Sequence, residues 1–355
     1  MKFSSGFYVG RRVLITGGLG FIGSNLALRL AAEGAKVTVL DPCVPGCGGS
    51  PYNLEGAQTS IRVLPLDIGS PEVPVEVLRE SQVIFNLAGE VSHAASMRMP
   101  ERDLSINTVA QLRFLQAVVA ANPGVRIVYA GTRQVYGVPE YLPVDEDHPV
   151  HPVDFNGIHK YAATMYHLMF TRLGLLDACV LQLTNVYGPR LSLDAPNQGV
   201  LGNFIRKLLR GERLTVYGDG NQLRDPVFVD DVVEAFLLLG ARKLRFRNYN
   251  IGGPEALKLR EIANQASEAA GVEPPTFCEF PSEFQSIDIG SYVGDRTRIL
   301  QEIGWQPSTP FAEGIVKTLA YYRGRYGFRP GRFAAVAAGM NPAEKPRSQN
   351  RKRVL

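Results

Sequence analysis

The sequence predicts an α/β protein built on a doubly wound parallel sheet, and three observations lead to this expectation. Short apolar runs, typical of buried strands, alternate with longer stretches in which apolar residues have helical spacing. A glycine-rich turn joins the first run to the first helical stretch. Polar residues or glycines follow most of the runs directly, and ligands bind at the carboxyl edge of such a sheet.

The first apolar run covers residues 12–16 and is expected to form a strand. It leads into the turn Gly17-Gly18-Leu19-Gly20-Phe21-Ile22-Gly23, and residues 24–32 then show helical spacing up to Gly34, which suits a helix C-cap. Glycine permits a tight turn and lets backbone N–H groups approach a pyrophosphate at the helix N-terminus. Strand, glycine turn and helix together predict a Rossmann domain that binds a dinucleotide.

The second run, residues 37–40, is the next expected strand, and Asp41 follows it. An acidic residue about 20 positions beyond the glycines can accept hydrogen bonds from both ribose hydroxyls of adenosine. The same carboxylate repels a 2′-phosphate, so the sequence favours NAD over NADP as the cofactor.

The alternation continues through four more runs. We expect strands at 61–66, 82–87, 125–130 and 179–183, with helices at 104–121 and 155–173. From Gly188 onward turns become denser, and we expect a short strand at 214–217 and helices at 230–239 and 258–270. The predicted organisation is an NAD-binding Rossmann domain over 1–187, a smaller substrate-binding lobe over 188–328 interleaved with it, and a basic, disordered tail over 329–355.

Charge and composition exclude several classes of protein. The net charge is +4, but residues 325–353 carry eight Lys and Arg against one Glu, so the rest of the chain is about −3 and has no nucleic-acid footprint. No run of 18 apolar residues and no secretory signal is visible, so we expect a cytoplasmic protein without a membrane span. The four cysteines are scattered, and no metal site is expected.

Several further motifs are recognisable along residues 11–322. They are Asn86-Leu87-Ala88-Gly89, Asn107, Val135-Tyr136-Gly137, Asn185-Val186-Tyr187-Gly188-Pro189, Gly218-Asp219-Gly220, the stretch from Arg224 to Asp231, and Gly304-Trp305-Gln306-Pro307. With the glycine turn, they make the chain resemble the extended short-chain dehydrogenase/reductase family, and within it the nucleotide-sugar epimerases and dehydratases. Family membership does not determine which reaction is catalysed.

The resemblance implies roles for individual residues. The implied cofactor-binding residues are Gly17, Gly20, Phe21, Ile22, Gly23, Asp41, Asp67, Ile68, Leu87, Ala88, Gly89, Asn107 and Lys160. The implied substrate-binding residues are Ser92, His93, Asn185, Asn203, Arg224 and Tyr292, and a guanidinium suits the diphosphate of a nucleotide sugar. A homodimer formed through a four-helix bundle is also implied, with apolar faces that include Leu104, Leu112, Leu115, Val118, Val119, Met165, Leu168 and Met169.

The catalytic triplet departs from the family pattern at one position. Thr132 stands where the family has Ser or Thr, and Lys160 where it has Lys, but the expected tyrosine is Asn156. An amide cannot act as a base near neutral pH, although it can orient a hydroxyl. Another group could supply the base, and the candidates are Tyr136, His93, Glu90, His159 and Lys160 itself; alternatively, the fold binds its ligands without turnover.

Two further departures bear on the reaction and the substrate. Dehydratases of the family have Asp-Glu directly after the Thr, and the related decarboxylases have a Glu; this chain has Arg133-Gln134, which disfavours both reactions. Many UDP-hexose epimerases have an arginine about seven residues before the tyrosine that corresponds to Tyr292, and here that position is Gln285.

The leading hypothesis is therefore an NAD-dependent nucleotide-sugar epimerase with a Thr132, Asn156 and Lys160 site. It would oxidise a ring carbinol transiently and return the hydride. The alternatives are a nucleotide-sugar dehydrogenase or ketoreductase, and a non-catalytic protein that binds NAD and a nucleotide sugar.

Overall fold

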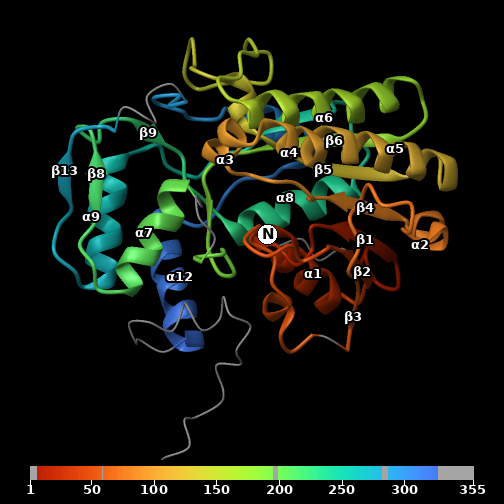
Figure 1. Cartoon of the computed structure of the whole chain (residues 1–355), viewed down its shortest axis with the longest axis horizontal. Coiled ribbons are helices and arrows are strands. Elements are labelled where there is room, and N and C mark those ends of the chain that lie inside the picture. Colours follow the sequence, from red (N-terminus) through yellow and green to blue (C-terminus); the bar gives the residue numbers. More distant parts are fainter. Residues whose placement is uncertain (1–5, 58, 195–198, 282–286, 327–355) are drawn as a thin grey trace, which may run out of the picture.

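The computed structural model describes residues 6–57, 59–194, 199–281 and 287–326. Its main sheet contains β1 (Arg12–Thr16), β2 (Lys36–Leu40), β3 (Ile61–Leu64), β4 (Val83–Asn86), β5 (Arg126–Thr132), β6 (Asp177–Leu183) and β11 (Asn248–Asn250). The strands lie in the order β11-β6-β5-β4-β1-β2-β3, and every neighbouring pair is parallel (Figure 1). The order reverses between β1 and β4, as in a doubly wound Rossmann sheet, which confirms the predicted fold class.

Helices cover both faces of this sheet, because alternate strand residues point to opposite sides. Val13 and Ile15 pack in one cluster with α1 (Phe21–Ala32), α8 (Val229–Ala241) and α11 (Thr297–Ile303). Leu14, on the other face, packs with α2 (Val75–Glu80), α5 (Ala110–Ala121) and α6 (Phe155–Arg172). Figure 1 shows α5 and α6 on one side of the sheet and α1 and α8 on the other.

All six strands that the sequence predicts for the sheet are present, with ends that differ by a few residues. The seventh strand, β11, was not expected, because Asn248-Tyr249-Asn250 contains a single apolar residue. It pairs with β6, and Tyr249 is fully buried. β11 thus joins the main sheet, and α8 packs on one face of it, so two elements from beyond residue 188 belong to the Rossmann domain.

The helix expected at 104–121 begins earlier and is not uniform. It runs from α4 (Pro100–Leu104) through a π-helical turn (Ser105–Val109) into α5. By length and apolar composition alone this stretch could cross a membrane, which is weak evidence because core helices of soluble proteins pass the same test. Its Phe114 is fully buried against the sheet, as are Leu115 and Val118, two of the residues on the apolar faces from which the sequence predicted a dimer bundle.

A second apolar core holds the smaller lobe, at the left of Figure 1. Its elements are α7 (Gly199–Leu209), β8 (Thr215–Tyr217), α9 (Leu259–Ala270), β13 (Thr276–Cys278) and α12 (Phe311–Tyr326). Short pairs connect the lobe to the sheet: β7 (Val186–Tyr187) with β10 (Val227–Phe228), and β9 (Leu223–Arg224) with β12 (Leu257–Lys258). The predicted tail, 329–355, and Gln285 lie outside the described residues.

Candidate active site

The glycine turn between β1 and α1 is a cradle of close backbone contacts. Gly17 has φ +68°, and a Cβ at this position would lie 2.8 Å from the carbonyl carbon of Leu87. A Cβ on Gly23 would lie 2.2 Å from the carbonyl oxygen of Gly17. Gly20 is the N-cap of α1, whose first turn begins with Phe21 and Ile22 and is not capped by a side chain. Open N–H groups beside closely packed glycines fit a pyrophosphate.

The acidic residues expected to bind adenosine lie at the same edge of the sheet. Asp41 directly follows β2 and is buried; its carboxylate accepts hydrogen bonds from the backbone N–H groups of Leu19 at 3.0 Å and Cys43 at 2.8 Å. Burial raises the pKa of Asp41 above its usual value despite these two bonds. Asp67 follows β3 and is exposed, while its neighbour Ile68 is buried.

Buried polar side chains hold the segment that follows β4. The Thr16 hydroxyl accepts hydrogen bonds from the N–H groups of Leu87 and Ala88, both at 3.1 Å. Asn107, in the π-helical turn, binds the backbone N–H and C=O of Glu90 at 3.1 and 3.0 Å. A Cβ on Gly89 would meet Asn107 Oδ1 at 2.7 Å, so only glycine fits there. These contacts, the glycine cradle and Asp41 together fit a dinucleotide cofactor.

Lys160 contacts β5 two residues before Thr132, near the carboxyl end of the strand. Thr132 is the last residue of this strand and caps the 3₁₀ turn Arg133–Tyr136, where its Oγ1 accepts a hydrogen bond from Gln134 N at 3.3 Å. Lys160, on α6, donates from Nζ to the carbonyl oxygen of Ala130 at 2.7 Å. The same Nζ would be 3.5 Å from a Cβ on Gly89, which places it beside the proposed cofactor segment.

Burial changes the chemistry of Lys160. The residue is 5% exposed, and burial disfavours its charged form, which lowers the pKa to about 8 although the charge of Asp103 acts in the opposite direction. Near neutral pH a measurable fraction of this amine is therefore neutral and able to accept a proton.

Asn156, at the position expected to hold tyrosine, is 2% exposed and held by the protein itself. Its Nδ2 donates to the carbonyl oxygen of Glu90 at 2.8 Å and to Asp103 Oδ2 at 3.0 Å. The other Asp103 oxygen lies 2.8 Å from Nδ1 of His159. Both amide hydrogens of Asn156 are thus used within the protein, and His159 is likewise paired with a carboxylate.

The other candidate bases are held in separate networks. Tyr136 is buried and donates its hydroxyl to Asn250 Oδ1 at 2.7 Å, and burial raises the pKa of its hydroxyl well above the usual value. Nδ1 of His93 lies 2.9 Å from Oδ2 of Asp154. Glu90 lies 3.1 Å from Nη2 of Arg102.

Asp154 connects Gln134, two residues after Thr132, to His93 in α3 (His93–Arg98), whose N-cap is Ser92. It accepts a hydrogen bond from Gln134 Nε2 at 2.9 Å and another from the N–H of Gly157 at 2.7 Å. Burial alone would raise the pKa of Asp154, but its bonds to His93, Gly157 and Gln134 outweigh burial and lower it. Asp154 is therefore a carboxylate and not an acid at neutral pH.

Four side chains from four segments gather next to Thr132, and we call them the Arg133 cluster: Arg133, Asn185, Arg224 and Tyr292. Arg133 Nη2 donates to Asn185 Oδ1 at 3.2 Å, and the Arg133 guanidinium carbon lies 4.9 Å from the centroid of the Tyr292 ring. Burial, and after it the charge of Arg133, lowers the pKa of Arg224 to about 10. The cluster brings together three of the predicted substrate residues.

Asp225 is a buried carboxylate close enough to Arg133 for the two charges to interact. It is 1% exposed and accepts hydrogen bonds from the Thr184 hydroxyl at 2.6 Å and from Gly294 N at 2.8 Å. Burial raises the pKa of Asp225 to about 6. Among the residues that the structure describes, Arg224 pairs not with Asp225 but with Asp288, at 3.9 Å.

Two functional candidates were missing from the sequence prediction. Arg133 was noted only as the residue that replaces an acid, although a charged side chain next to Thr132 was the available signal. Asp103 had no sequence signal, because α4 brings it to Asn156 and His159 only in the folded chain. Conversely, Asn203 on α7 accepts a hydrogen bond from Arg206, and within the described part of the chain no hydrogen bond joins it to the Arg133 cluster.

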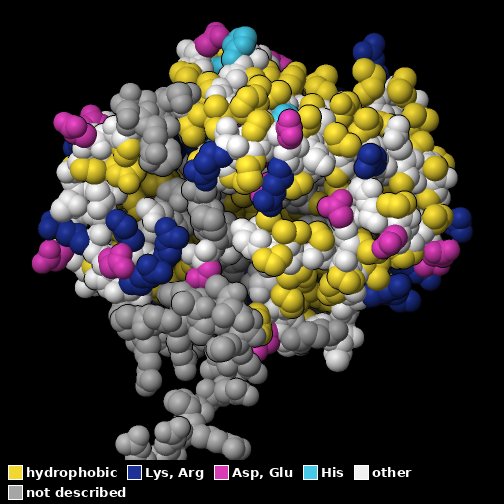
Figure 2. All heavy atoms as spheres, in the orientation of Figure 1, with side chains coloured by type: hydrophobic (Ala, Val, Ile, Leu, Met, Phe, Trp, Pro, Cys, Tyr) yellow, Lys and Arg dark blue, Asp and Glu magenta, His cyan; other side chains and the backbone are white. Residues whose placement is uncertain are grey.

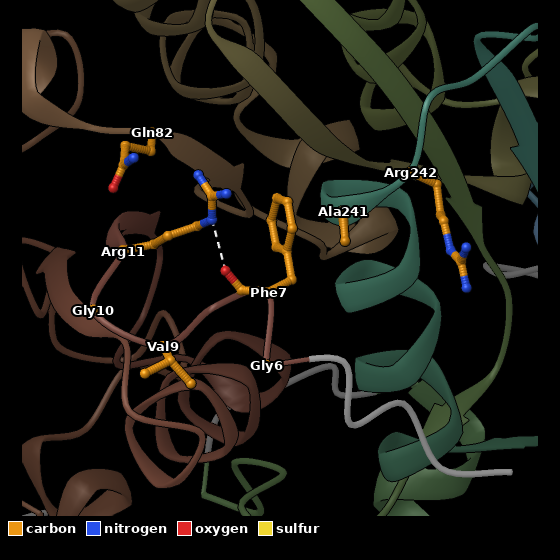
Figure 3. A pocket seen from close by; sticks show the side chains of 8 residues that line it. All are labelled: Gly6, Phe7, Val9, Gly10, Arg11, Gln82, Ala241 and Arg242. Carbon is orange, nitrogen blue, oxygen red and sulfur yellow. Dashed lines mark hydrogen bonds between the residues drawn. The ribbon is translucent and has the colours of Figure 1, made fainter.

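A pocket at the amino edge of the sheet is remote from this site. It is lined by Gly6, Phe7, Val9, Gly10, Arg11, Gln82, Ala241 and Arg242 (Figure 3). Ligands of doubly wound sheets bind at the carboxyl edge instead. In the described ranges, no group of three His, Cys, Asp or Glu residues is arranged to hold a metal ion.

Comparisons with known proteins agree with this geometry. Residues 13–252 match the NAD dependent epimerase/dehydratase family. A UDP-glucose 4-epimerase of Mycolicibacterium smegmatis is 35% identical over 88% of this chain and 99% of its own length. A UDP-glucuronic acid decarboxylase 1 of Xenopus tropicalis is 31% identical over 88% of this chain and 72% of its own.

The fold comparison gives the same result. A UDP-glucose 4-epimerase of Thermotoga maritima, solved with UDP-glucose, superposes with a TM-score of 0.78 and 30% identity, over 88% of this chain and 99% of that one. The relatives differ in reaction but all act on nucleotide sugars. The chain therefore belongs to the NAD dependent epimerase/dehydratase family.

Proposed function

We propose that this chain is an NAD-dependent epimerase that inverts one ring carbinol of a nucleotide-linked sugar through a transient keto-sugar. The observation that carries the proposal is Lys160 on α6, a buried amine with a pKa of about 8 that donates to the carbonyl oxygen of Ala130 in β5. NAD, when bound, supplies the hydride acceptor and donor that this chemistry needs. Oxidation and reduction cancel, so the sugar changes only in configuration.

The proposed proton path uses two side chains. The Thr132 hydroxyl hydrogen-bonds the reacting sugar hydroxyl and orients it toward Lys160. Neutral Lys160 Nζ accepts the hydroxyl proton as the carbonyl forms, and the resulting ammonium returns it when the carbonyl is reduced. The proton balance is zero over one turnover, as epimerisation requires.

Asn156 has a positioning role in this proposal and does not touch the reacting hydroxyl. Its amide holds the Glu90 carbonyl and Asp103, and Asp103 is the carboxylate whose charge acts on Lys160. The amide thus replaces the missing tyrosine structurally, while the lysine takes over the proton transfer.

The residues beside Thr132 favour epimerisation over elimination or decarboxylation. An acid that expels a leaving group would have to follow Thr132, and this chain has Arg133 and Gln134 there. Gln134 is buried and its amide donates to Asp154. Asp154 itself is held in the ionised form, so it has no proton to deliver near neutral pH.

A non-catalytic protein that binds NAD and a nucleotide sugar is the second candidate. Asn156 favours it, because the usual base is absent and the amide is satisfied within the protein. Product analysis separates the two candidates. Purified protein is incubated with NAD and with UDP-, GDP-, dTDP- and CDP-sugars, and the products are separated by chromatography. A new sugar isomer without accumulation of NADH supports epimerisation, whereas binding without product supports the second candidate.

We also propose that the protein is a homodimer. Leu104, Ile158, Met165 and Met169 are each more than 40% exposed and lie on the α4–α5 stretch and α6. Figure 2 shows hydrophobic side chains gathered over this part of the molecule. Contiguous exposed apolar surface of this kind is typical of an interface. Light scattering coupled to size-exclusion chromatography measures the mass in solution.

A further inference from the structure

We propose that the sugar of this substrate carries a carboxylate, as a hexuronic acid does, and that Arg133 binds that carboxylate. This inference rests on the proposed function, because it names the substrate class of the same site. It comes from the hydrogen-bond donors that the Arg133 cluster presents.

Three donors of the cluster have no hydrogen-bond partner among the described residues. They are Nη1 of Arg133, Nδ2 of Asn185 and the hydroxyl of Tyr292, and all three atoms are buried. The residues that carry them are in mutual contact: Arg133 bonds Asn185 through Nη2 and lies over the Tyr292 ring. Nearly all buried donors in native proteins are paired, so three neighbouring ones indicate a ligand group that accepts.

The donor set is more suitable for a carboxylate than for a hydroxyl. A guanidinium and an amide NH₂ can only donate, and a carboxylate has two oxygens that only accept. A sugar hydroxyl also brings a proton that needs an acceptor of its own. A planar guanidinium further matches the geometry of a carboxylate.

Charge leads to the same conclusion. Within the described ranges no carboxylate forms an ion pair with Arg133, although Asp225 and Asp288 are near enough to act on it electrostatically. Both Asp225 oxygens already have a partner: Oδ1 accepts a hydrogen bond from the Thr184 hydroxyl, and Oδ2 accepts one from Gly294 N. Burial lowers the pKa of Arg133, so the nearby carboxylates do not fully offset the cost of burying its charge. An anionic ligand would stabilise the charged guanidinium.

The position of Arg133 assigns this anion to the sugar end of the substrate. Arg133 follows Thr132 directly, and in the proposed function Thr132 holds the reacting ring hydroxyl. Arg224, from β9, is the second guanidinium of the cluster. Its Nη1 donates to the carbonyl oxygens of Leu223 and Gly290, and its Nε and Nη2, which donate to no acceptor among the described residues, are left for the diphosphate. A carboxylate on the carbon next to the reacting carbinol would lie nearest to Arg133.

The experiment is calorimetric titration of the NAD-loaded protein with UDP, UDP-glucose and UDP-glucuronic acid. The two sugars differ in the carboxylate, so their affinity ratio isolates it. We expect UDP-glucuronic acid to bind on the order of 10- to 100-fold more tightly than UDP-glucose, as a hydrogen-bonded buried charge predicts. Arg133→Gln should abolish this preference and leave the affinity for UDP within about threefold of the unaltered protein. Tyr292→Phe should reduce the preference without abolishing it.

Arg79→Gln, on the exposed side of α2, is the matched control and should keep the preference. Thermal unfolding of each variant verifies that it is folded. Equal weakening of all three ligands by Arg133→Gln would place Arg133 on the diphosphate and overturn the proposal. A protein that binds UDP-glucuronic acid no better than UDP-glucose, including one that binds neither, also overturns it. Preference without isomer formation would instead refute the epimerase and keep the carboxylate site.

Discussion

If Lys160 is the base, turnover should rise with pH as its amine loses a proton. Burial stabilises the neutral form, and the pKa falls from the usual 10.5 to about 8. At pH 7 about a tenth of the amine is then neutral, compared with roughly 0.03% for a solvent-exposed lysine, a gain on the order of 300-fold. The same burial costs folding stability below pH 8, and this cost is relieved as pH rises from about 8 to 10.5.

The assay is kcat/KM for isomer formation as a function of pH, with NAD saturating. We expect an ascending limb with a midpoint near pH 8 in the unaltered protein. Asp103→Asn removes the charge that raises the pKa of Lys160, so its midpoint should move to lower pH. A merely structural defect would lower the rate at every pH and leave the midpoint unchanged.

Substitution of Lys160 tests its role as the base directly. We expect Lys160→Ala to lower turnover by about 10²- to 10⁴-fold, the usual contribution of a positioned base. Small primary amines should partly restore the rate, in proportion to the neutral amine present. Titration with NAD separates proton transfer from cofactor binding. Unchanged turnover of Lys160→Ala, or a flat pH profile in the unaltered protein, would refute the reasoning.

Three further expectations concern the cofactor cradle, Asn156 and the exposed helix face. Gly23→Ala places a Cβ 2.2 Å from Gly17 O, so it should weaken NAD binding at least tenfold, as measured by calorimetry; Gly324→Ala, which has open space around it, is the control. Asn156→Tyr leaves Asp103 with one partner fewer and should lower the free energy of unfolding by about 1–3 kcal/mol without raising turnover; a gain in turnover would mean that the lysine is not the base. Met165→Glu with Met169→Glu should halve the mass measured by light scattering, and an unchanged dimer mass would place the interface elsewhere.

Local sequence was sufficient to predict the fold and the NAD cofactor. The glycine turn, the strand before it and Asp41 lie within 30 residues of one another, and their chemistry depends on backbone geometry that short-range sequence encodes. Apolar runs predicted six of the seven strands of the sheet for the same reason. The strand Asn248–Asn250 was not predicted because two of its three residues are polar, and Asn250 becomes buried only in the folded chain, where this segment pairs with β6.

The tertiary structure decided which residues form the proposed substrate half of the site. Arg133, Asn185, Arg224 and Tyr292 come from segments up to 159 residues apart, and their contacts depend on how the smaller lobe packs on the sheet. Likewise, the identity of residue 156 could be noted from sequence, but its satisfaction by Asp103 and Glu90 could not. Burial is a property of the packed molecule. It lowers the pKa of Lys160, and it leaves three donors of the Arg133 cluster without a hydrogen-bond partner among the described residues.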